Sequence, residues 1–475
     1  PAVFAPVTGW LDTPANQKIA YADKMLDRSV FATWSQVKEM EQSGLVEIAS
    51  HTHNLHNGIN ANPSGGQLPS VIAPEYKNGK YETEDAYKNR LKSDFTRTVQ
   101  TLVNHIGKKP RVMVWPYGQF NDVSVQIARQ AGMPHYFSLG EKIVNKVGDK
   151  HIGRLLLNAE TDLNTVKNYL DGIDESKQIQ RVLHVDLDYV YDADKAQQAK
   201  NLDKLIDRIY RYGVTTVYLQ AFSDPDGDGV ADALYFPNKY LPVRDDIFGR
   251  IAWQLQTRAG VQVYAWMPVL AFDLRKGVKE AEYVIDSRTG KPSTKAYLRL
   301  SPYNKQNVEI IKSIYNDLSF YAKFNGILFH DDAFLTDFEG AEGDHAEGMV
   351  SPQAKQKTQD LIQLTHQLTD ALKPYFLRGS YSLKTARNLY ASVITNPNAE
   401  EWLAQNLKTL TDNYDTTAIM AMPYMENEQP ISQKEAYQWF ASLIENVKAQ
   451  APLEKVLFEF QAVNWRTQKP IPESE

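Results

Sequence analysis

The stretch Gly326-Ile327-Leu328-Phe329-His330-Asp331-Asp332 joins a short apolar run directly to three titratable residues. This pattern is typical of a buried parallel strand whose carboxyl end carries functional side chains. Similar apolar runs recur along the second part of the chain: Val182–Val190, Thr215–Phe222, Val261–Val269, Thr417–Tyr424 and Val456–Ala462, with Leu383–Tyr390 as a weaker candidate. Amphipathic stretches separate these runs, and such alternation predicts a parallel sheet flanked by helices.

The number of these units favours a (β/α)8 barrel of the TIM type, with a doubly wound open sheet as the alternative. Only about seven strands can be counted, so the barrel is expected to lack its last unit. Functional residues of such barrels lie at the carboxyl ends of the strands. Asp331 and Asp332 are therefore candidate catalytic residues, because paired carboxylates cleave glycosidic bonds. The same pair could instead bind a cationic sugar or hold the barrel mouth together.

The composition narrows the class of protein. A chain of 475 residues exceeds what one hydrophobic core usually supports, so two domains are expected. The net charge of −6 gives no support for nucleic-acid binding. The sequence contains no cysteine, which excludes disulfides, thiolate zinc sites and cysteine nucleophiles. No apolar run approaches the roughly 18 residues that span a bilayer.

The first part of the chain has a less regular α/β pattern. The apolar run Leu45–Ala49 leads into Ser50-His51, and Arg111–Trp115 leads into Pro116-Tyr117-Gly118. We predict a first domain over residues 1–175 and a barrel domain over 180–475, with a polar linker around 171–176. The opening run Pro1–Val7 indicates a core strand, so we expect the natural N-terminus to lie upstream.

The first candidate site is Ser50-His51-Thr52-His53-Asn54-Leu55-His56, directly after a predicted strand. A loop at a strand end can turn two imidazoles toward one metal ion, because each ring offers one nitrogen. The competing interpretation is a surface loop of hydrogen-bonded histidines.

These motifs resemble the polysaccharide deacetylase family, the NodB-homology carbohydrate esterases. His51-Thr52 and His56 match the second family motif with one additional spacer residue, and Trp115-Pro116-Tyr117-Gly118 matches the third. Val114 stands where many members carry arginine. In the additional spacer residue and in Val114, the sequence resembles the periplasmic poly-β-1,6-N-acetyl-D-glucosamine N-deacetylases of biofilm operons. Further matching stretches are Val185–Asp192, Ala221–Gly229, Tyr264–Val269 and Phe329–Ala333.

The resemblance implies a deacetylase-type (β/α) barrel over the first domain and a divalent metal ion, either zinc, nickel, cobalt or iron. His51 and His56 would be two of its ligands, beside an aspartate, and a second aspartate would act as the base. The backbone N–H of Tyr117 would belong to the oxyanion hole, which makes Tyr117 a catalytic residue. His53 occupies a spacer position and is expected to be a neighbour rather than a ligand.

One family motif has no match. The Asp-Asp stretch that carries the base and the third ligand is absent, and Asp12, the nearest acid in the sequence, follows the wrong strand. The first barrel is therefore expected to be incomplete at its start. We further expect that the chain of 475 residues, expressed as written, does not deacetylate.

For the second domain, the resemblance implies a barrel that binds and hydrolyses partly deacetylated poly-glucosamine. Asp331 and Asp332 would be catalytic, and the expected substrate-binding residues are Asp337, Tyr218, Asp224, Trp266, Tyr424 and Trp465. One alternative is a non-catalytic barrel that guides polymer to an export pore. Another is an unrelated metal-dependent amidohydrolase with an accessory barrel.

Asp224-Pro225-Asp226-Gly227-Asp228-Gly229 is similar to the start of a calcium-binding loop. Tyr235 replaces the glutamate expected at the twelfth position, so an acidic loop lining the sugar groove is favoured. Finally, the resemblance implies a periplasmic location, an outer-membrane lipoprotein anchor in the full-length protein and an outer-membrane export porin as partner.

Overall fold

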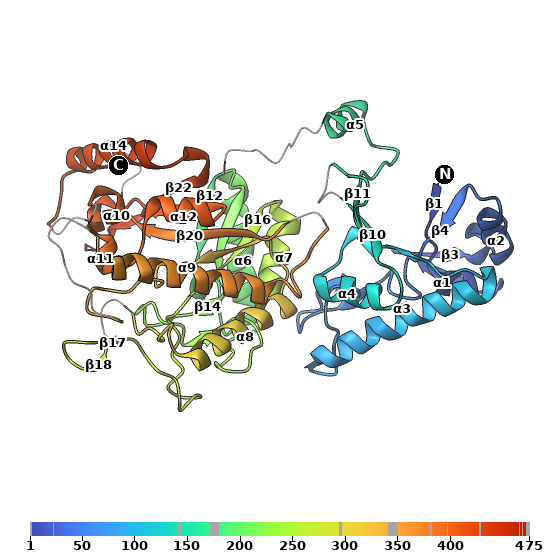
Figure 1. The fold of residues 1–475 in the computed structure, drawn as a ribbon, viewed down its shortest axis with the longest axis horizontal. Coiled ribbons are helices and arrows are strands. Elements are labelled where there is room, and N and C mark those ends of the chain that lie inside the picture. Colours follow the sequence, from blue (N-terminus) through green and yellow to red (C-terminus); the bar gives the residue numbers. More distant parts are fainter. Residues whose placement is uncertain are drawn as a thin grey trace.

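The computed structural model describes residues 2–21, 23–139, 144–171, 180–293, 297–340, 350–379, 382–396, 398–426, 429–464, 466–467 and 469–471. Figure 1 shows two units side by side, the first coloured blue to cyan and the second green to red. Residues 172–179, which contain most of the expected linker, lie outside the described residues, so the domain boundary stays a prediction. In the described part of the chain, no helix has the length and apolar character needed to cross a membrane.

The second unit is built on a seven-stranded sheet with the strand order β12-β13-β16-β19-β20-β21-β22. The strands are β12 (Val182–Val185), β13 (Thr216–Gln220), β16 (Gln262–Met267), β19 (Gly326–Phe329), β20 (Lys384–Tyr390), β21 (Thr416–Met420) and β22 (Val456–Glu459). Every pair of neighbours is parallel. The longer helices between them are α6 (Lys195–Arg211), α7 (Phe248–Gln254), α8 (Lys305–Tyr321), α9 (Pro352–Leu372), α12 (Leu407–Asn413) and α14 (Gln433–Gln450).

The sheet curls into a barrel around a common interior. One buried cluster draws side chains from all seven strands: Val182, Tyr218, Tyr264, Trp266, Leu328, Ala386, Ala418 and Leu457. Between the two end strands, His184 Nε2 on β12 lies 2.8 Å from Glu459 Oε1 on β22. The described residues form no backbone ladder there. The predicted barrel lacking one unit is confirmed.

Local sequence explains how the outer helices pack. On α6, Leu202, Ile206 and Ile209 recur at helical spacing and are buried on one face, which packs into the core of the barrel unit. Ser351 caps α9 by accepting a hydrogen bond from the backbone N–H of Ala354, and Pro352 occupies the first turn, where its missing N–H costs nothing.

The first unit is an open array of parallel strands. β1 (Ala2–Phe4) pairs with β4 (Val46–Ile48), and β9 (Val112–Val114), β10 (His135–Leu139) and β11 (His151–Arg154) form a second sheet. A parallel bridge between Ser50 and Met113 joins the two sheets. Among the helices are α2 (Trp34–Gln42), α3 (Glu84–Ile106) and α4 (Asp122–Gln130). This arrangement confirms the expected incomplete α/β barrel.

The two units share a hydrophobic core. Tyr87, Trp115 and Phe120 of the first unit belong to the same buried cluster as Phe320 and Tyr375 of the second. The Tyr375 hydroxyl also donates to Glu84 Oε1 at 2.5 Å. Because apolar surface from both units is removed from water together, separating them would expose it.

Candidate functional site

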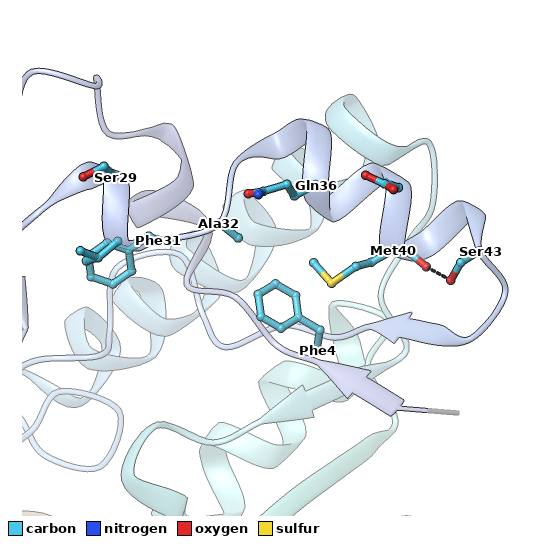
Figure 2. Close-up of a pocket in the computed structure, with 9 residues that line it drawn as sticks. Phe4, Ser29, Phe31, Ala32, Gln36, Met40 and Ser43 are labelled. Carbon is cyan, nitrogen blue, oxygen red and sulfur yellow. Dashed lines mark hydrogen bonds between the residues drawn. The ribbon is translucent and has the colours of Figure 1, made fainter.

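One hollow of the first unit offers little chemistry. It has a volume of about 650 Å³ and lies beside β1, where Figure 2 shows the Phe4 and Met40 side chains next to one another. Glu39 is its only titratable lining residue. A second pocket, of about 400 Å³, contains His51 and is the better candidate. It is lined by Val3, Ala5, His51, Val114, Trp115, Tyr117, Gly118, Phe137, Leu139, Arg154 and Leu156.

The backbone places His51 at the end of an extended strand. Ser50 N donates to Val112 O and Val114 N donates to Ser50 O, so residue 50 continues the sheet and His51 follows at its edge. His51 Nδ1 lies 2.6 Å from Val114 O. Because a carbonyl oxygen only accepts, Nδ1 carries the proton and Nε2 keeps the lone pair that a metal ion requires.

The structure brings His56 beside His51, with 4.9 Å between the ring centroids. Burial is the main cause that lowers the pKa of His51 to about 4, with smaller contributions from His56 and Arg154, and it also lowers the pKa of His56. Both rings are therefore neutral at physiological pH, which is the form that ligates metals.

His53 turns away from this pair. Its Nδ1 lies 2.9 Å from Thr8 Oγ1, and its backbone N–H donates to Asp94 Oδ1. Asp94 Oδ2 accepts from Asn54 N as well, so this α3 carboxylate holds the loop between the two candidate ligands. His53 thus lies where a neighbour, rather than a ligand, was expected.

His51 and His56 suit part of a divalent metal site, because neutral imidazoles with a free Nε2 are common ligands of such ions. A complete site needs more. Within the described ranges, the only group of at least three acidic or histidine side chains close enough to share an ion is Asp224, Asp226 and Asp228, which belongs to the second unit. The described residues therefore supply two candidate ligands at this position.

Tyr117 stands at the rim of the same pocket. Its ring centroid lies 4.5 Å from that of His56, and its side chain is 44% exposed. Its backbone is left-handed, with φ 56°, and Gly118 follows with φ 70°. A left-handed backbone is unfavourable for a tyrosine, so the surroundings must hold this turn.

At the barrel mouth, Asp331 is bound by three side chains. His330 Nδ1 contacts its Oδ1, and the hydroxyls of Tyr297 and Tyr390 donate to it at 2.9 and 2.8 Å. Burial alone would raise the pKa of Asp331, but the His330 charge and these hydrogen bonds lower it overall. Burial lowers the pKa of His330, but the charges of Asp331 and Asp332 raise it overall. Asp331 is thus an ionised carboxylate beside a cationic imidazole.

Asp332 has a different environment. It is fully buried, and its carboxylate accepts hydrogen bonds from the backbone N–H groups of Val269, Leu270 and Ala271. These donors belong to the segment that follows β16, so Asp332 joins two neighbouring strand ends. The structure therefore does not support Asp332 as a partner of Asp331 in catalysis.

The expected stacking residues have different surroundings. Trp266 stacks on His330, with ring centroids 5.2 Å apart and planes 8° apart. Tyr218 is only 1% exposed and packs inside the barrel against His184 and Tyr264, so its expected role in stacking on sugar is corrected to a core role. Tyr424, on α13 (Pro423–Glu426), lines a hollow of about 100 Å³ with aromatic neighbours. Trp465 lies outside the described residues.

The two remaining acids lie in loops. Asp224 accepts hydrogen bonds from the backbone N–H groups of Gly227, Asp228 and Gly229, so its carboxylate shapes its own loop. Asp337 is half-buried in the loop after β19 and stays a candidate for substrate binding.

The sequence reasoning did not select Glu426, which ends α13 directly after β21. Burial, together with the charge of Asp331, raises the pKa of Glu426 to about 7, although backbone hydrogen bonds from Ala391 and Ser392 oppose the shift. The signal in the sequence was an acid just beyond a strand end, at the position where barrels carry functional groups.

Comparisons with known proteins agree with this two-part arrangement. The family described as "Polysaccharide deacetylase" matches residues 1–136, and the family described as "Hypothetical glycosyl hydrolase family 13" matches residues 184–475. A poly-beta-1,6-N-acetyl-D-glucosamine N-deacetylase of Escherichia coli strain K12 is 39% identical over 98% of this chain and 72% of its own length.

Two further similarities cover parts of the chain. A Staphylococcus aureus protein of the same description is 28% identical over 30% of this chain and 42% of its own length. The solved structure of a glycoside hydrolase domain from Bordetella bronchiseptica is 41% identical, covers 62% of this chain and 87% of that domain, and superimposes with a TM-score of 0.56.

Proposed function

Because this chain belongs to the poly-β-1,6-N-acetyl-D-glucosamine N-deacetylase family, we propose that it acts on this polymer at two sites. The pocket of His51 and His56 holds the metal for removal of N-acetyl groups. The barrel mouth binds the partly deacetylated polymer and cleaves it at Asp331. The observation that carries the second role is the carboxylate of Asp331, which His330, Tyr297 and Tyr390 contact and whose charge helps to raise the pKa of Glu426.

At the first site, a bound divalent ion would polarise the acetamide carbonyl and lower the pKa of a coordinated water. His51 and His56 would hold that ion, and the Val114 carbonyl orients His51 for this task. The backbone N–H of Tyr117 would stabilise the oxyanion. The reaction also needs a third ligand and a base, and the described residues place neither beside the imidazoles.

At the second site, Asp331 and Glu426 are suited to opposite roles. Environments that push two carboxyl pKa values apart assign one group as the acid and the other as the base or nucleophile. Asp331, held ionised by His330, is the base or nucleophile, and Glu426, protonated below its pKa of about 7, is the acid. A deacetylated glucosamine carries an ammonium group, which the negative charge of this mouth attracts.

We also propose that the protein works in the periplasm and passes polymer to an outer-membrane export porin. The resemblance to the biofilm deacetylases supports this location and this partner.

The proposed barrel activity is tested with partly deacetylated polymer and with fully acetylated polymer as the control. We expect the 475-residue chain to shorten only the former, as measured by size-exclusion chromatography and mass spectrometry of the products. Tight binding without shortening would favour the alternative of a non-catalytic binding module. Acetate release by the same chain would overturn the expectation that these 475 residues do not deacetylate.

The pH dependence of cleavage follows from Glu426. A general acid must be protonated, and the raised pKa of about 7 keeps Glu426 protonated below that pH. We therefore expect kcat/KM to fall by about tenfold per pH unit above pH 7. Glu426→Gln should lose most of the activity and also this alkaline limb. An unchanged profile in Glu426→Gln would show that another group sets the limb.

A further inference from the structure

A segment of the barrel unit forms part of the support of the deacetylase pocket. Residues 374–379, which follow α9, run beside residues 118–123 of the first unit. Phe120 N donates to Arg378 O at 3.2 Å, and Arg378 N donates back to Phe120 O at 2.8 Å. Val123 N donates to Pro374 O at 3.2 Å. These backbone bonds form an antiparallel bridge between two segments that are far apart in the sequence.

Side chains strengthen this bridge on the first unit's side. Arg378 Nη1 donates to Asp122 Oδ1 at 2.9 Å, and its guanidinium lies 5.3 Å from the ring centroid of Phe120. The ring of Phe120 is fully buried in the shared core. On the barrel side, the buried Lys323 ammonium donates to Tyr375 O at 3.1 Å, which anchors the segment to the end of α8.

Gly379 makes the closest approach to the pocket. A Cβ at this position would lie 2.4 Å from the carbonyl oxygen of Gly118, which is nearer than van der Waals contact permits. On the opposite side, a Cβ at Gly118 would lie 2.7 Å from the Leu139 side chain. The turn that follows Tyr117 is thus enclosed between Leu139 of its own unit and Gly379 of the barrel unit.

This enclosure accounts for the backbone of Tyr117. A non-glycine residue in the left-handed region costs about 1–3 kcal/mol and persists only where its surroundings impose it. Trp115 and Pro116 carbonyls accept from Gly118 N and Gln119 N, and the next amide in the turn, Phe120 N, donates to the barrel unit. The turn therefore depends on contacts from both units.

We propose that residues 374–379 of the barrel unit are a positioning element for the deacetylase pocket. Arg378 and Gly379 hold the Tyr117–Phe120 turn so that Tyr117 stays beside His56. The catalytic consequence rests on the proposed function, in which the Tyr117 backbone stabilises the oxyanion.

The test compares Gly379→Ala with Gly260→Ala in the full chain. Gly260 also has a positive φ, 66°, and a Cβ there meets nothing within 4 Å, so this variant places an alanine at a left-handed position without the contact. Gly379 has φ 131°, which strains an alanine more, so the comparison reads the location of the faster exchange and not its total size. We expect amide hydrogen exchange of residues 117–120 to accelerate by about tenfold or more in Gly379→Ala alone. Cleavage of partly deacetylated polymer should stay within about twofold of wild type, because a local change spares the barrel mouth.

Acetate binding to the zinc-loaded protein supplies a second measurement. Acetate should bind about tenfold more weakly to Gly379→Ala, because its carboxylate would lose one hydrogen bond from the Tyr117 N–H. The affinity for zinc should be unchanged. Arg378→Ala keeps the Gly379 contact but loses the Asp122 ion pair. It should therefore show a smaller increase in amide exchange and a smaller loss of acetate affinity than Gly379→Ala. Arg378→Lys should reverse part of both effects. Amide exchange at residues 117–120 equal to that of Gly260→Ala, or accelerated evenly in both units, would overturn the inference. A wild-type chain that binds no zinc would instead contradict the proposed function, and the exchange measurement would still decide the inference.

Discussion

Asp331→Asn is expected to lower cleavage of partly deacetylated polymer by about a thousandfold, because an amide can act neither as a base nor as a nucleophile. The side chain keeps its shape and can still accept from the Tyr297 and Tyr390 hydroxyls. The fold should therefore persist, with the melting temperature measured alongside product formation. Asp412→Asn, on the surface of α12, is the matched control and should retain full activity.

Asp332→Asn distinguishes the two neighbouring aspartates. Its amide group would face the backbone N–H groups of Leu270 and Ala271, which both donate to one carboxylate oxygen. We expect the free energy of unfolding to fall by about 2–4 kcal/mol, since buried donors would lose a charged acceptor. Any loss of activity should follow that instability. If Asp332→Asn stayed fully stable and inactive while Asp331→Asn remained active, the assignment would be reversed.

His51→Ala is expected to weaken binding of zinc to the 475-residue chain by at least about 100-fold, as measured by isothermal titration calorimetry. The imidazole lost is the one whose Nε2 is left free by the contact between Nδ1 and the Val114 carbonyl. His56→Ala should have a similar effect, because the ring centroids of His51 and His56 lie 4.9 Å apart.

His53→Ala is the control for these two variants. Its ring binds Thr8 instead of facing the pair, so zinc affinity should stay within about twofold of wild type. Equal losses in all three variants would mean that the histidine loop binds the ion without a defined ligand pair. Zinc binding that survives in His51→Ala and His56→Ala would place the ion elsewhere, and the Asp224, Asp226 and Asp228 loop is the first position to examine.

Local sequence was sufficient to predict the elements of the fold. Most of the barrel strands are apolar runs because both of their faces are buried, although β20 carries Arg387 and Asn388 among its apolar residues. The outer helices carry an apolar stripe of their own. His51 and His56 likewise lie in one loop after a strand, so the sequence alone predicted that the two rings lie close together. The order of motifs along the chain similarly indicated a deacetylase unit followed by a barrel.

Only the tertiary structure separated residues that are equivalent in the sequence. Asp331 and Asp332 are adjacent acids at one strand end, yet packing turns the first to His330 and the second to the backbone after β16. Tyr218 lies near the end of β13, but the curl of the sheet closes it inside the barrel. Glu426 gains its raised pKa from burial and from Asp331, which lies 95 positions earlier in the chain.

The sequence by itself thus determined the strands, the helices and the two histidines, because apolar periodicity and loop spacing are local properties. The tertiary structure decided the surroundings of each carboxylate and that Gly379 of the barrel contacts the turn of Tyr117. These outcomes depend on charge, burial and close contact between segments distant in sequence, and such contacts form only when the chain has packed.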